Sequence, residues 1–374
     1  MNLHIFNDEY GLFPNLAEET INKLAPKKNL LLNITRFQKV SNPRIQLLAP
    51  EVKAMRQFVD QLSQVDKIVL HPLNVQTGYL LLLLKKRFPK VPVYWVCWSY
   101  DVYNYYYKPE QIYLPFSLSM WKRNARGRWR AWLQKGLPGY FLSWIFPLKS
   151  YQHLAKCTRL VDYFCSFLEE DYQVALRVSP NQRMQYLPFA YLSIEQILHP
   201  ELRQSPSANT IMLGHAASYE SNHFEMIDDL SALHLPNKIL IPLAYGDPVY
   251  KSAVILKAQQ AGFSELEIQE EKLSSAAYYA KLGEVAHAIF NVRVQQALGN
   301  LLGLIYMGAK VYLREETSTY KQFVHWGLQV YPYSALSTEI QTPMSLVDQN
   351  RNREIMRKRF QRSRVDSLWE VLVQ

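Results

Sequence analysis

Cysteine is scarce in this sequence, and the few cysteines follow no pattern that forms disulfides or binds a metal. The chain has 374 residues and three cysteines, Cys97, Cys157 and Cys165, with no Cys-x-x-Cys or Cys/His spacing. An odd number without such spacing argues against a disulfide framework. We therefore expect buried thiols in a reducing compartment.

We also find no sequence pattern typical of a signal peptide, a membrane-spanning helix or a disordered chain. Its first residues, MNLHIFNDEYGLF, lack a basic start followed by an apolar core, so we expect no signal peptide. The longest apolar runs, such as 79–84, are far too short to span a bilayer. A composition that is 48% hydrophobic and 13% aromatic excludes wholesale disorder, and the length fits two domains.

Acidic residues are missing from one long stretch, between Glu110 and Asp162. The chain has a net charge of +10, and this stretch holds the cations Lys122, Arg123, Arg126, Arg128, Arg130, Lys135, Lys149, Lys156 and Arg159. Large aromatic residues lie among them: Trp121, Trp129, Trp132, Tyr140, Phe141, Trp144 and Phe146. Aromatic residues beside cations are typical of contact with anionic lipid headgroups, which is our interpretation. A solvated basic helix or a nucleic-acid groove would use the same residue types.

Short apolar runs alternate with helical segments in the first half of the chain, which predicts a parallel α/β domain. We expect strands at 3–6, 30–34, 45–48, 67–70, 93–97, 163–167 and 184–187, and helices at 15–24, 51–62 and 77–87. His71 and Asp101 follow two of these strands. They should therefore lie at the carboxyl edge of the sheet, where ligands bind in such folds.

The same alternation resumes after the polar, turn-rich segment 203–209, which we interpret as an interdomain linker. Strands are expected at 210–213, 238–243, 266–268, 287–290 and 310–313, with helices between them. The predicted domains are 1–203 and 204–343. Residues 344–374 are basic and amphipathic, and they should form terminal helices that pack back on the first domain.

One βαβ step, at 287–316, is a candidate phosphate site. The apolar run 287–290 predicts a buried strand, and the polar turn 295–300 leads into a helix at 301–307 that Gly308 ends. Unpaired N–H groups at the start of such a helix can hold a phosphate. A plain packed βαβ unit with a polar turn explains the same residues.

Two Rossmann-like domains with returning terminal helices describe the GT-B architecture of glycosyltransferases. The second domain contains LGHAASYESNHFEMI (213–227), KILIPLAYGDPVY (238–250), EKLSSAAYYAKL (271–282) and VQQALGNLLGLIYMGAKVYL (294–313). With these segments the chain resembles glycosyltransferase family 56. Members of that family move N-acetylfucosamine from its dTDP form to a lipid-linked oligosaccharide in enterobacterial common antigen synthesis.

In the first domain the resemblance depends on VLHPLN (69–74) and WVCWSYDVY (95–103). The sequence also departs from the family. The basic aromatic segment 119–150 is longer, and Ala297 and Asn300 stand where the family has Gly and Thr.

The resemblance implies a donor site for a nucleotide diphosphate-sugar on three loops of the second domain. The expected donor-binding residues are Gly214, Ser218, Ser221, Asn222, Tyr245, Gly246, Arg293, Gln295, Gln296, Gly299 and Asn300. For some of these residues a structural role is the alternative to donor binding. Ser221 and Asn222 can cap a helix, Tyr245 can pack at a strand end, and Arg293 can form a surface ion pair.

Glycosyl transfer with inversion needs a base that removes the proton of the acceptor hydroxyl. Asp101 is the first candidate, His71 the second and Asp8 the third. A turn-capping carboxylate and a hydrogen-bonded structural histidine are the alternatives for the first two. Arg293 is a candidate to stabilise the leaving diphosphate, because no Asp-x-Asp metal motif is visible and the fold usually works without a bound metal or cofactor.

We therefore expect an inverting glycosyltransferase that is peripheral on the cytoplasmic face of the plasma membrane. Its partners would be a dTDP-sugar, a lipid-linked glycan acceptor and an anionic membrane surface, with no nucleic acid. Membrane and acceptor contact is expected from Trp121, Lys122, Arg123, Arg126, Arg128, Trp129, Arg130 and Trp132. The alternatives are a UDP- or GDP-sugar donor, or a nucleic-acid- or lipid-binding module on a degenerate GT-B scaffold.

Overall fold

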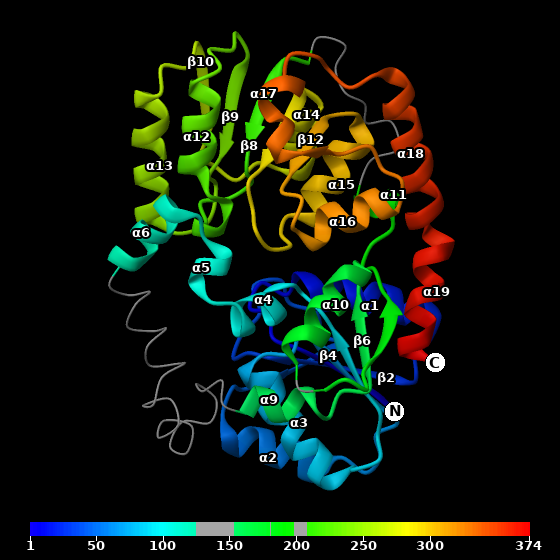
Figure 1. Cartoon of the computed structure of the whole chain (residues 1–374). Helices are drawn as coiled ribbons and strands as arrows, with labels where there is room; N and C mark the ends of the chain where they lie inside the picture. Colours follow the sequence, from blue (N-terminus) through cyan, green and yellow to red (C-terminus); the bar gives the residue numbers. More distant parts are fainter. Residues whose placement is uncertain (125–152, 180, 198–207) are drawn as a thin grey trace. The chain divides into compact units, whose positions relative to one another are not determined.

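The computed structural model describes residues 1–124, 153–179, 181–197 and 208–374, and the chain divides into two compact units (Figure 1). The first unit comprises Met1–Tyr106, Arg126–Ser193 and Arg362–Gln374. The second comprises Tyr107–Ala125 and Ile194–Gln361.

The first unit is built on a seven-stranded parallel sheet with the order β3-β2-β1-β4-β5-β6-β7. Its strands are β1 (Asn2–Phe6), β2 (Asn29–Ile34), β3 (Ile45–Leu48), β4 (Lys67–His71), β5 (Val93–Val96), β6 (Tyr163–Ser166) and β7 (Gln185–Pro188). Its helices are α1 (Leu12–Leu24), α2 (Val52–Gln61), α3 (Val75–Arg87), α4 (Tyr100–Tyr106), α9 (Leu154–Thr158), α10 (Glu169–Val178) and α19 (Arg362–Val373). Continuous apolar strands are what a parallel sheet covered on both faces requires.

The second unit is built on a six-stranded parallel sheet with the order β10-β9-β8-β11-β12-β13. Its strands are β8 (Thr210–Leu213), β9 (Lys238–Pro242), β10 (Glu265–Gln269), β11 (Val285–Phe290), β12 (Lys310–Leu313) and β13 (Tyr331–Pro332). Its helices are α5 (Pro109–Ile112), α6 (Pro115–Arg123), α11 (Ile194–Ile197), η3 (Tyr219–Ser221), α12 (His223–Ser231), α13 (Pro248–Gln260), α14 (Ser275–Gly283), α15 (Leu298–Met307), α16 (Ser318–His325), η4 (Tyr333–Ala335), α17 (Leu336–Glu339) and α18 (Leu346–Phe360).

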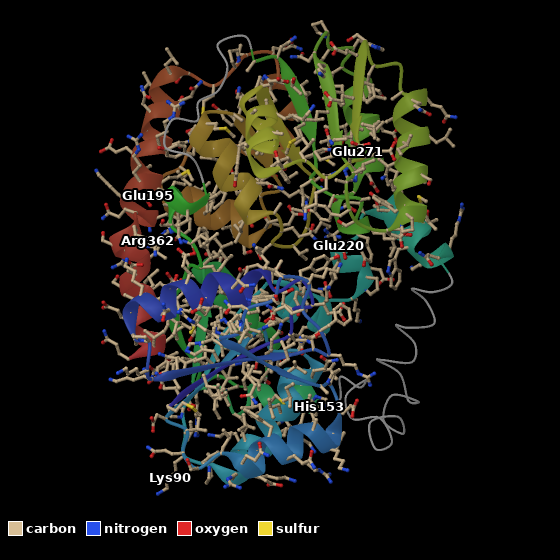
Figure 2. All side chains as sticks on the ribbon, turned by 180° about the vertical axis from the view of Figure 1, so that it is seen from behind. Lys90, His153, Glu195, Glu220, Glu271 and Arg362 are labelled. Atoms are coloured by element: carbon tan, nitrogen blue, oxygen red, sulfur yellow. The ribbon has the colours of Figure 1, made fainter. Side chains whose placement is uncertain are left out.

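Each unit has its own apolar core, and the side chains fill both units (Figure 2). In the second unit, residues of α12 and α13 such as Ile227 and Val254 pack against Ile211 and Ile241 of the sheet. In the first, α19 places Trp369 among the core side chains.

The order of the strands changes direction at one place in each sheet. In the first unit this place lies between β1 and β4, and in the second between β8 and β11. We call them the first and second switch points. In open α/β sheets, ligands bind outside the carboxyl ends of the strands at such a point, because the connecting helices diverge there.

The predicted fold class is confirmed, because both sheets are parallel and flanked by helices, and α19 packs back on α1 of the first unit. The strands predicted by apolar runs lie within one or two residues of the observed ones. The short strand β13 and the helices α5, α6, α16 and α17 were not predicted.

The two units also differ from the predicted domain ranges. The segment 107–125, which comes between β5 and β6 in sequence, packs with the second unit. Glu225 of α12 accepts hydrogen bonds from the amides of Phe116 (3.0 Å) and Ser117 (3.3 Å) at the start of α6. Phe116 also stacks on Phe224. The predicted terminal helices separate: α18 contacts α15 in the second unit, whereas α19 belongs to the first.

The cysteines are free thiols, of which Cys157 and Cys165 are buried as predicted and Cys97 is half-buried. Burial raises the pKa of the Cys157 thiol to about 12. In the part of the chain that the structure describes, no helix combines the length and apolarity needed to cross a bilayer. Among these residues there is also no group of His, Cys, Asp or Glu side chains suited to a metal ion.

Candidate functional site

The loops after β8 and β9 meet at the carboxyl edge of the second sheet. The amide of Ala217 donates to the carbonyl of Tyr245 (2.8 Å), and the amide of Asp247 donates to the carbonyl of Ala217 (2.8 Å). The amide of Gly214 donates to the carbonyl of Ile289 in β11 (2.9 Å). These backbone contacts fix the loops beside the second switch point.

Two glycines allow this close approach. Gly214 has a φ of +63°, and a Cβ there would lie 2.7 Å from Nε2 of His223. Gly246 has a φ of +127°, and a Cβ there would collide with the carbonyl of Ala217. Both positions therefore need glycine for conformation and for space.

The N-cap residues of the two helices that begin at the second switch point make no side-chain cap. The first amide of α12, that of His223, donates to the hydroxyl of Tyr250 instead (3.0 Å). Helices α13, α14 and α16 start with caps from Asp247, Ser274 and Thr317. Helices α12 and α15 start at Asn222 and Ala297, which have positive φ values of 52° and 56° and no side-chain cap. Unpaired N–H groups and the positive end of the helix dipole make such helix starts suitable for anions.

Four buried side-chain atoms near the same point have no hydrogen-bond partner among the described residues: His215 Nδ1, His223 Nε2, Arg293 Nε and Gln296 Oε1. The His215 ring stacks on Phe290 and meets the edge of Tyr245. Burial lowers the pKa of His215 to about 4, so its imidazole is neutral near pH 7. A buried polar atom without a partner costs free energy, so water, an ion or a bound ligand usually supplies one.

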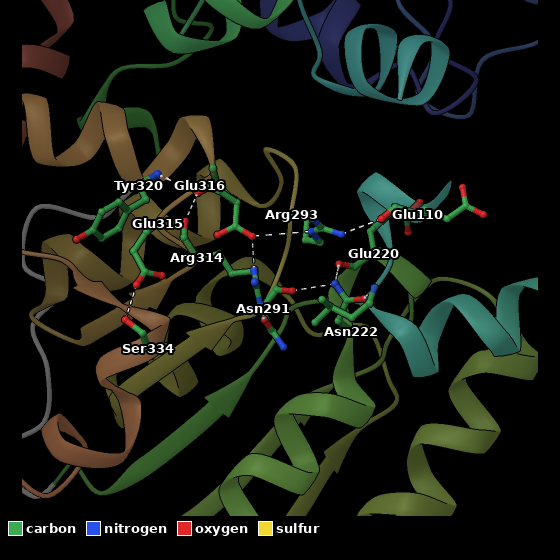
Figure 3. A network of polar contacts seen from close by, with 12 residues as sticks. Glu110, Glu220, Asn222, Asn291, Arg293, Arg314, Glu315, Glu316, Tyr320 and Ser334 are labelled. Atoms are coloured by element: carbon green, nitrogen blue, oxygen red, sulfur yellow. Dashed lines mark hydrogen bonds and ion pairs between the residues drawn. The ribbon is translucent and has the colours of Figure 1, made fainter. Parts of the chain in front are cut away.

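Arg293 is held at this point by partners on both sides (Figure 3). Its Nη1 donates to the carbonyl of Glu110 (2.8 Å), and its Nε lies 3.9 Å from Oε1 of Glu316. Arg314 donates from Nε to the same Glu316 oxygen (2.6 Å) and from Nη1 to Oδ1 of Asn291 (3.0 Å). Arg293 is on the loop between β11 and α15, not on a helix, and its ion pair with Glu316 is the alternative to phosphate binding.

Ser221 and Asn222, predicted phosphate ligands, are fully buried and occupied by other contacts. The Ser221 hydroxyl donates to the carbonyl of Ala216 (3.2 Å). Asn222 accepts from the amide of Leu114 (2.9 Å) and donates to the carbonyl of Asn291 (2.8 Å). This geometry favours a structural role for both side chains over phosphate binding.

The remaining predicted donor residues lie around the second switch point. Tyr245 is 61% exposed at the end of β9, Ser218 is half-buried, and Gln295 is buried. Gly299 and Asn300 were expected in a turn, but α15 begins at Leu298 and includes both in its first turn. The reason is that Ala297 adopts the left-handed conformation that ends the loop.

Asp101, the first candidate base, is 1% exposed. Its carboxylate accepts hydrogen bonds from Nε1 of Trp95 (2.6 Å) and the amides of Trp98 (2.9 Å) and Leu73 (3.2 Å). Burial raises its pKa to about 6, although these hydrogen bonds oppose the shift. The geometry favours the turn-capping role.

His71, the second candidate, is also completely buried. Its ring nitrogens lie 3.2 Å from Nδ1 of His4 and 2.5 Å from the hydroxyl of Tyr191, and burial lowers its pKa well below the usual value. Asp8, the third candidate, is half-buried on the loop after β1. It accepts hydrogen bonds from the amides of Tyr10 (2.9 Å) and Phe13 (3.1 Å).

Of the predicted membrane residues, Trp121, Lys122 and Arg123 are described, at the end of α6. Trp121 packs on Tyr113 with ring centroids 5.4 Å apart, Lys122 pairs with Glu110 (3.1 Å), and Arg123 is exposed. The others lie outside the described residues: Arg126, Arg128, Trp129, Arg130 and Trp132.

His215 and His223 lie near the second switch point and were not predicted as ligands. For His215 a signal was available. The available signal was its position directly after the strand 210–213 and Gly214, because the same position relative to a strand selected His71. The sequence could not show that Nδ1 of His215 lacks a partner.

Comparison with known proteins identifies the architecture. No protein-family model matches the sequence, and no curated protein matches it. Among solved structures, the lipopolysaccharide outer core galactosyltransferase WaaB in its apo form is similar, with a TM-score of 0.65 at 10% identity, covering 100% of this chain and 99% of that one.

Two further structures are similar over nearly their whole lengths. HepE of Anabaena, solved with UDP and glucose, has a TM-score of 0.63 at 8% identity, covering 99% of this chain and 98% of that one. Sucrose-phosphate synthase of Thermosynechococcus elongatus has a TM-score of 0.61 at 11% identity, covering 100% and 96%. The chain therefore has the GT-B fold of nucleotide-sugar glycosyltransferases.

Proposed function

We propose that this protein is an inverting glycosyltransferase whose second unit binds a nucleotide diphosphate-sugar. The observation that carries the proposal is the second switch point, with two uncapped helix starts and unpaired buried atoms on His215, Arg293 and Gln296. A diphosphate can accept from Arg293 and from helix N–H groups, and sugar hydroxyls can pair with Gln296. A nucleotide diphosphate-sugar would thus supply partners for buried polar atoms and helix N–H groups whose lack of partners costs free energy.

The donor we propose is a dTDP-linked deoxy-amino sugar resembling N-acetylfucosamine, and the acceptor a lipid-diphosphate-linked glycan at the cytoplasmic face of the membrane. The resemblance to glycosyltransferase family 56 supports this choice of substrates. The GT-B fold and the switch-point geometry support the class of reaction. The chain's charge of +10 favours an anionic acceptor and an anionic membrane surface.

In the proposed reaction the acceptor oxygen attacks the anomeric carbon and the bond from that carbon to the phosphate oxygen breaks. The electron pair leaves with the nucleotide diphosphate, whose charge Arg293 and the start of α15 would stabilise. The acceptor proton passes to a carboxylate. We propose Asp8, because it is the candidate base that is not completely buried.

A UDP- or GDP-sugar is the nearest alternative donor, and one observation favours UDP. Similar solved structures were obtained with UDP and glucose or with UDP-2-fluoro glucose. A different class of function, nucleic-acid or lipid binding on a non-catalytic GT-B scaffold, has only the positive charge in its favour.

Thermal unfolding with dTDP, UDP, GDP and CMP tests the proposal. A ligand that binds only the folded state stabilises it, by about 2.7 kcal/mol at a hundred times its Kd. We expect one nucleoside diphosphate to raise the unfolding temperature, and CMP, which lacks a diphosphate, to have little effect. No response to any nucleotide, together with salt-sensitive binding of DNA or RNA, would contradict the enzyme proposal.

A further inference from the structure

Two arginines at the carboxyl edge of the second sheet share one carboxylate, that of Glu316 (Figure 3). Nε of Arg314 donates to Oε1 of Glu316 (2.6 Å), and Nε of Arg293 lies 3.9 Å from the same oxygen. Arg314 directly follows β12, and its Nη1 donates to Oδ1 of Asn291, which directly follows the neighbouring strand β11 (3.0 Å). We call Arg293, Arg314 and Glu316 the arginine–glutamate cluster.

The other carboxyl groups in Figure 3 do not balance the second guanidinium. The Glu110 carboxylate pairs with Lys122 (3.1 Å), and Glu315 accepts a hydrogen bond from the hydroxyl of Ser334. Burial raises the pKa of Glu220, which favours the neutral form of its carboxyl group. Among the side chains of this network, two guanidiniums therefore face one free carboxylate.

The Glu316 side chain can leave the cluster without opening the turn that carries it. It is 45% exposed, and its contact with Arg314 joins two residues of the same turn, so the pair contributes little to the stability of the fold. The turn is held by other contacts. The hydroxyl of Thr317 donates to the carbonyl of Arg314 (2.7 Å) and accepts from the amide of Tyr320 at the start of α16 (3.2 Å).

A diphosphate suits the two guanidiniums better than a single carboxylate does. Guanidinium groups bind phosphate oxygens through paired, charge-assisted hydrogen bonds, and a diphosphate carries more negative charge than one carboxylate. Nε of Arg293 is buried and has no hydrogen-bond partner among the described residues, so a phosphate oxygen would add a bond there without breaking one. Arg293 also lies on the loop that leads into α15, whose N-cap residue makes no side-chain cap.

We infer that Glu316 stands in for the donor's diphosphate in the free protein, and that it releases Arg293 and Arg314 to the diphosphate when the donor binds. The inference rests on the proposed function and adds to it a second cation, Arg314, and a displaceable internal anion. Glu316 holds two like charges in place before binding, which preorganises the site. It also selects ligands, because only a group with enough negative charge replaces it.

Titration of dTDP, UDP and GDP into matched variants tests this inference. Glu316→Gln keeps the size of the side chain and removes the competing charge, so it should bind the preferred nucleotide about 3- to 10-fold more tightly than the unmodified chain. Glu315→Gln is the matched control, because it removes the same charge one residue away and its carboxylate contacts Ser334 instead. Its affinity should equal that of the unmodified chain. Isothermal titration compares the three proteins.

Variants of Arg314 test the second half of the inference. Arg314→Ala should weaken binding about 10-fold, and Arg314→Lys, which keeps the charge but loses the paired hydrogen bonds, should lie between. In Arg314→Ala/Glu316→Gln the gain from the second substitution should shrink, because Glu316 then competes for one guanidinium only. Normal affinity in Arg314→Ala would contradict this half.

The outcomes separate the inference from the proposed function. Unchanged or weaker binding by Glu316→Gln, or an equal gain in Glu315→Gln, would overturn the inference and leave the proposed function standing. Failure of the unmodified chain and Glu316→Gln alike to bind any of the three nucleotides would overturn both. Urea unfolding should show that Glu316→Gln is as stable as the unmodified chain, so that a change in affinity reports on the site.

Discussion

The first and second switch points have the same topology but differ in how fully their polar groups are hydrogen-bonded. At the first, Asn74 caps α3 by accepting from the amides of Gln76 (3.0 Å) and Thr77 (3.1 Å), and it donates to Oδ1 of Asn7 (2.9 Å). There Gly11 provides no cap for α1, but the Asp8 carboxylate accepts from the amide of Phe13 in its first turn (3.1 Å). At the second, the N-cap residues of α12 and α15 make no side-chain cap. The strands of the two sheets alone give no reason for this difference.

The buried ionisable groups of the two units also differ in how fully they are hydrogen-bonded. Asp101 and His71 each have several partners inside the first unit. In the second, His215 and Arg293 each have a buried nitrogen without a hydrogen-bond partner among the described residues, although that of Arg293 lies 3.9 Å from Oε1 of Glu316. Among the described residues of the first unit, Oε1 of Gln76 at the start of α3 is likewise without a hydrogen-bond partner. The comparison teaches that a polar residue after a strand is a weak indication of a site, and that its unmet hydrogen-bonding capacity is a stronger one.

The largest expected effect tests whether the first switch point supplies the base. We expect Asp8→Asn to lower turnover by about 10²- to 10⁴-fold, because the amide cannot take the acceptor proton. Nucleotide affinity should be unchanged, since the donor site is in the second unit. Initial rates and nucleotide titrations measure the two effects, with the neighbouring exposed Glu9→Gln as the control. Normal turnover in Asp8→Asn would remove Asp8 from the role.

The next effect concerns Asp101, whose partners make it a structural residue. In Asp101→Asn an amide N–H group replaces an acceptor that faces buried donors, so the free energy of unfolding should fall by about 3 kcal/mol. Exposed Asp60→Asn is the control. Urea unfolding measures both. A fully stable but inactive Asp101→Asn would restore Asp101 as the base and erase the contrast between the switch points.

The pH dependence of stability gives a second readout of Asp101. Its folded pKa of about 6 is above the usual 3.8, so the folded state binds more protons between these values. This group's contribution to stability is therefore present below about pH 4 and is lost as pH rises to about 6. Asp101→Asn should remove that slope.

The fold was predictable from the sequence because a parallel sheet needs continuous apolar strands, and runs such as 210–213 and 310–313 match the observed strands. The position of 107–125 was not predictable, because it depends on Glu225 and Phe224 from far along the chain. The loops of the second switch point were predictable from turn residues. Which side chains there lack partners was not, since two of the three contacts of Asn222 are with Leu114 and Asn291, far along the chain.

A smaller effect tests the second switch point directly. Arg293→Ala should weaken binding of the nucleoside diphosphate by about 10- to 100-fold, the range expected for a charge-assisted hydrogen bond to phosphate. Arg87→Ala, a surface ion-pair residue of the first unit, should leave it unchanged. Isothermal titration of both variants makes the comparison. Equal affinities of the two variants for the nucleoside diphosphate would indicate that the Arg293 guanidinium contacts only Glu110 and Glu316.

The smallest effect distinguishes an unpaired site atom from an ordinary buried hydrogen bond. Gln296→Met removes a buried acceptor that has no partner in the described chain while keeping a similar volume. The free protein should be as stable as before or more stable by up to about 1 kcal/mol, because an unmet polar atom is no longer buried. Binding of the nucleotide-sugar should weaken by about 3- to 10-fold, with the bare nucleotide less affected if Gln296 contacts the sugar. Thermal unfolding with and without donor separates these outcomes, and a clear loss of stability in the free protein would show that Gln296 is part of the scaffold.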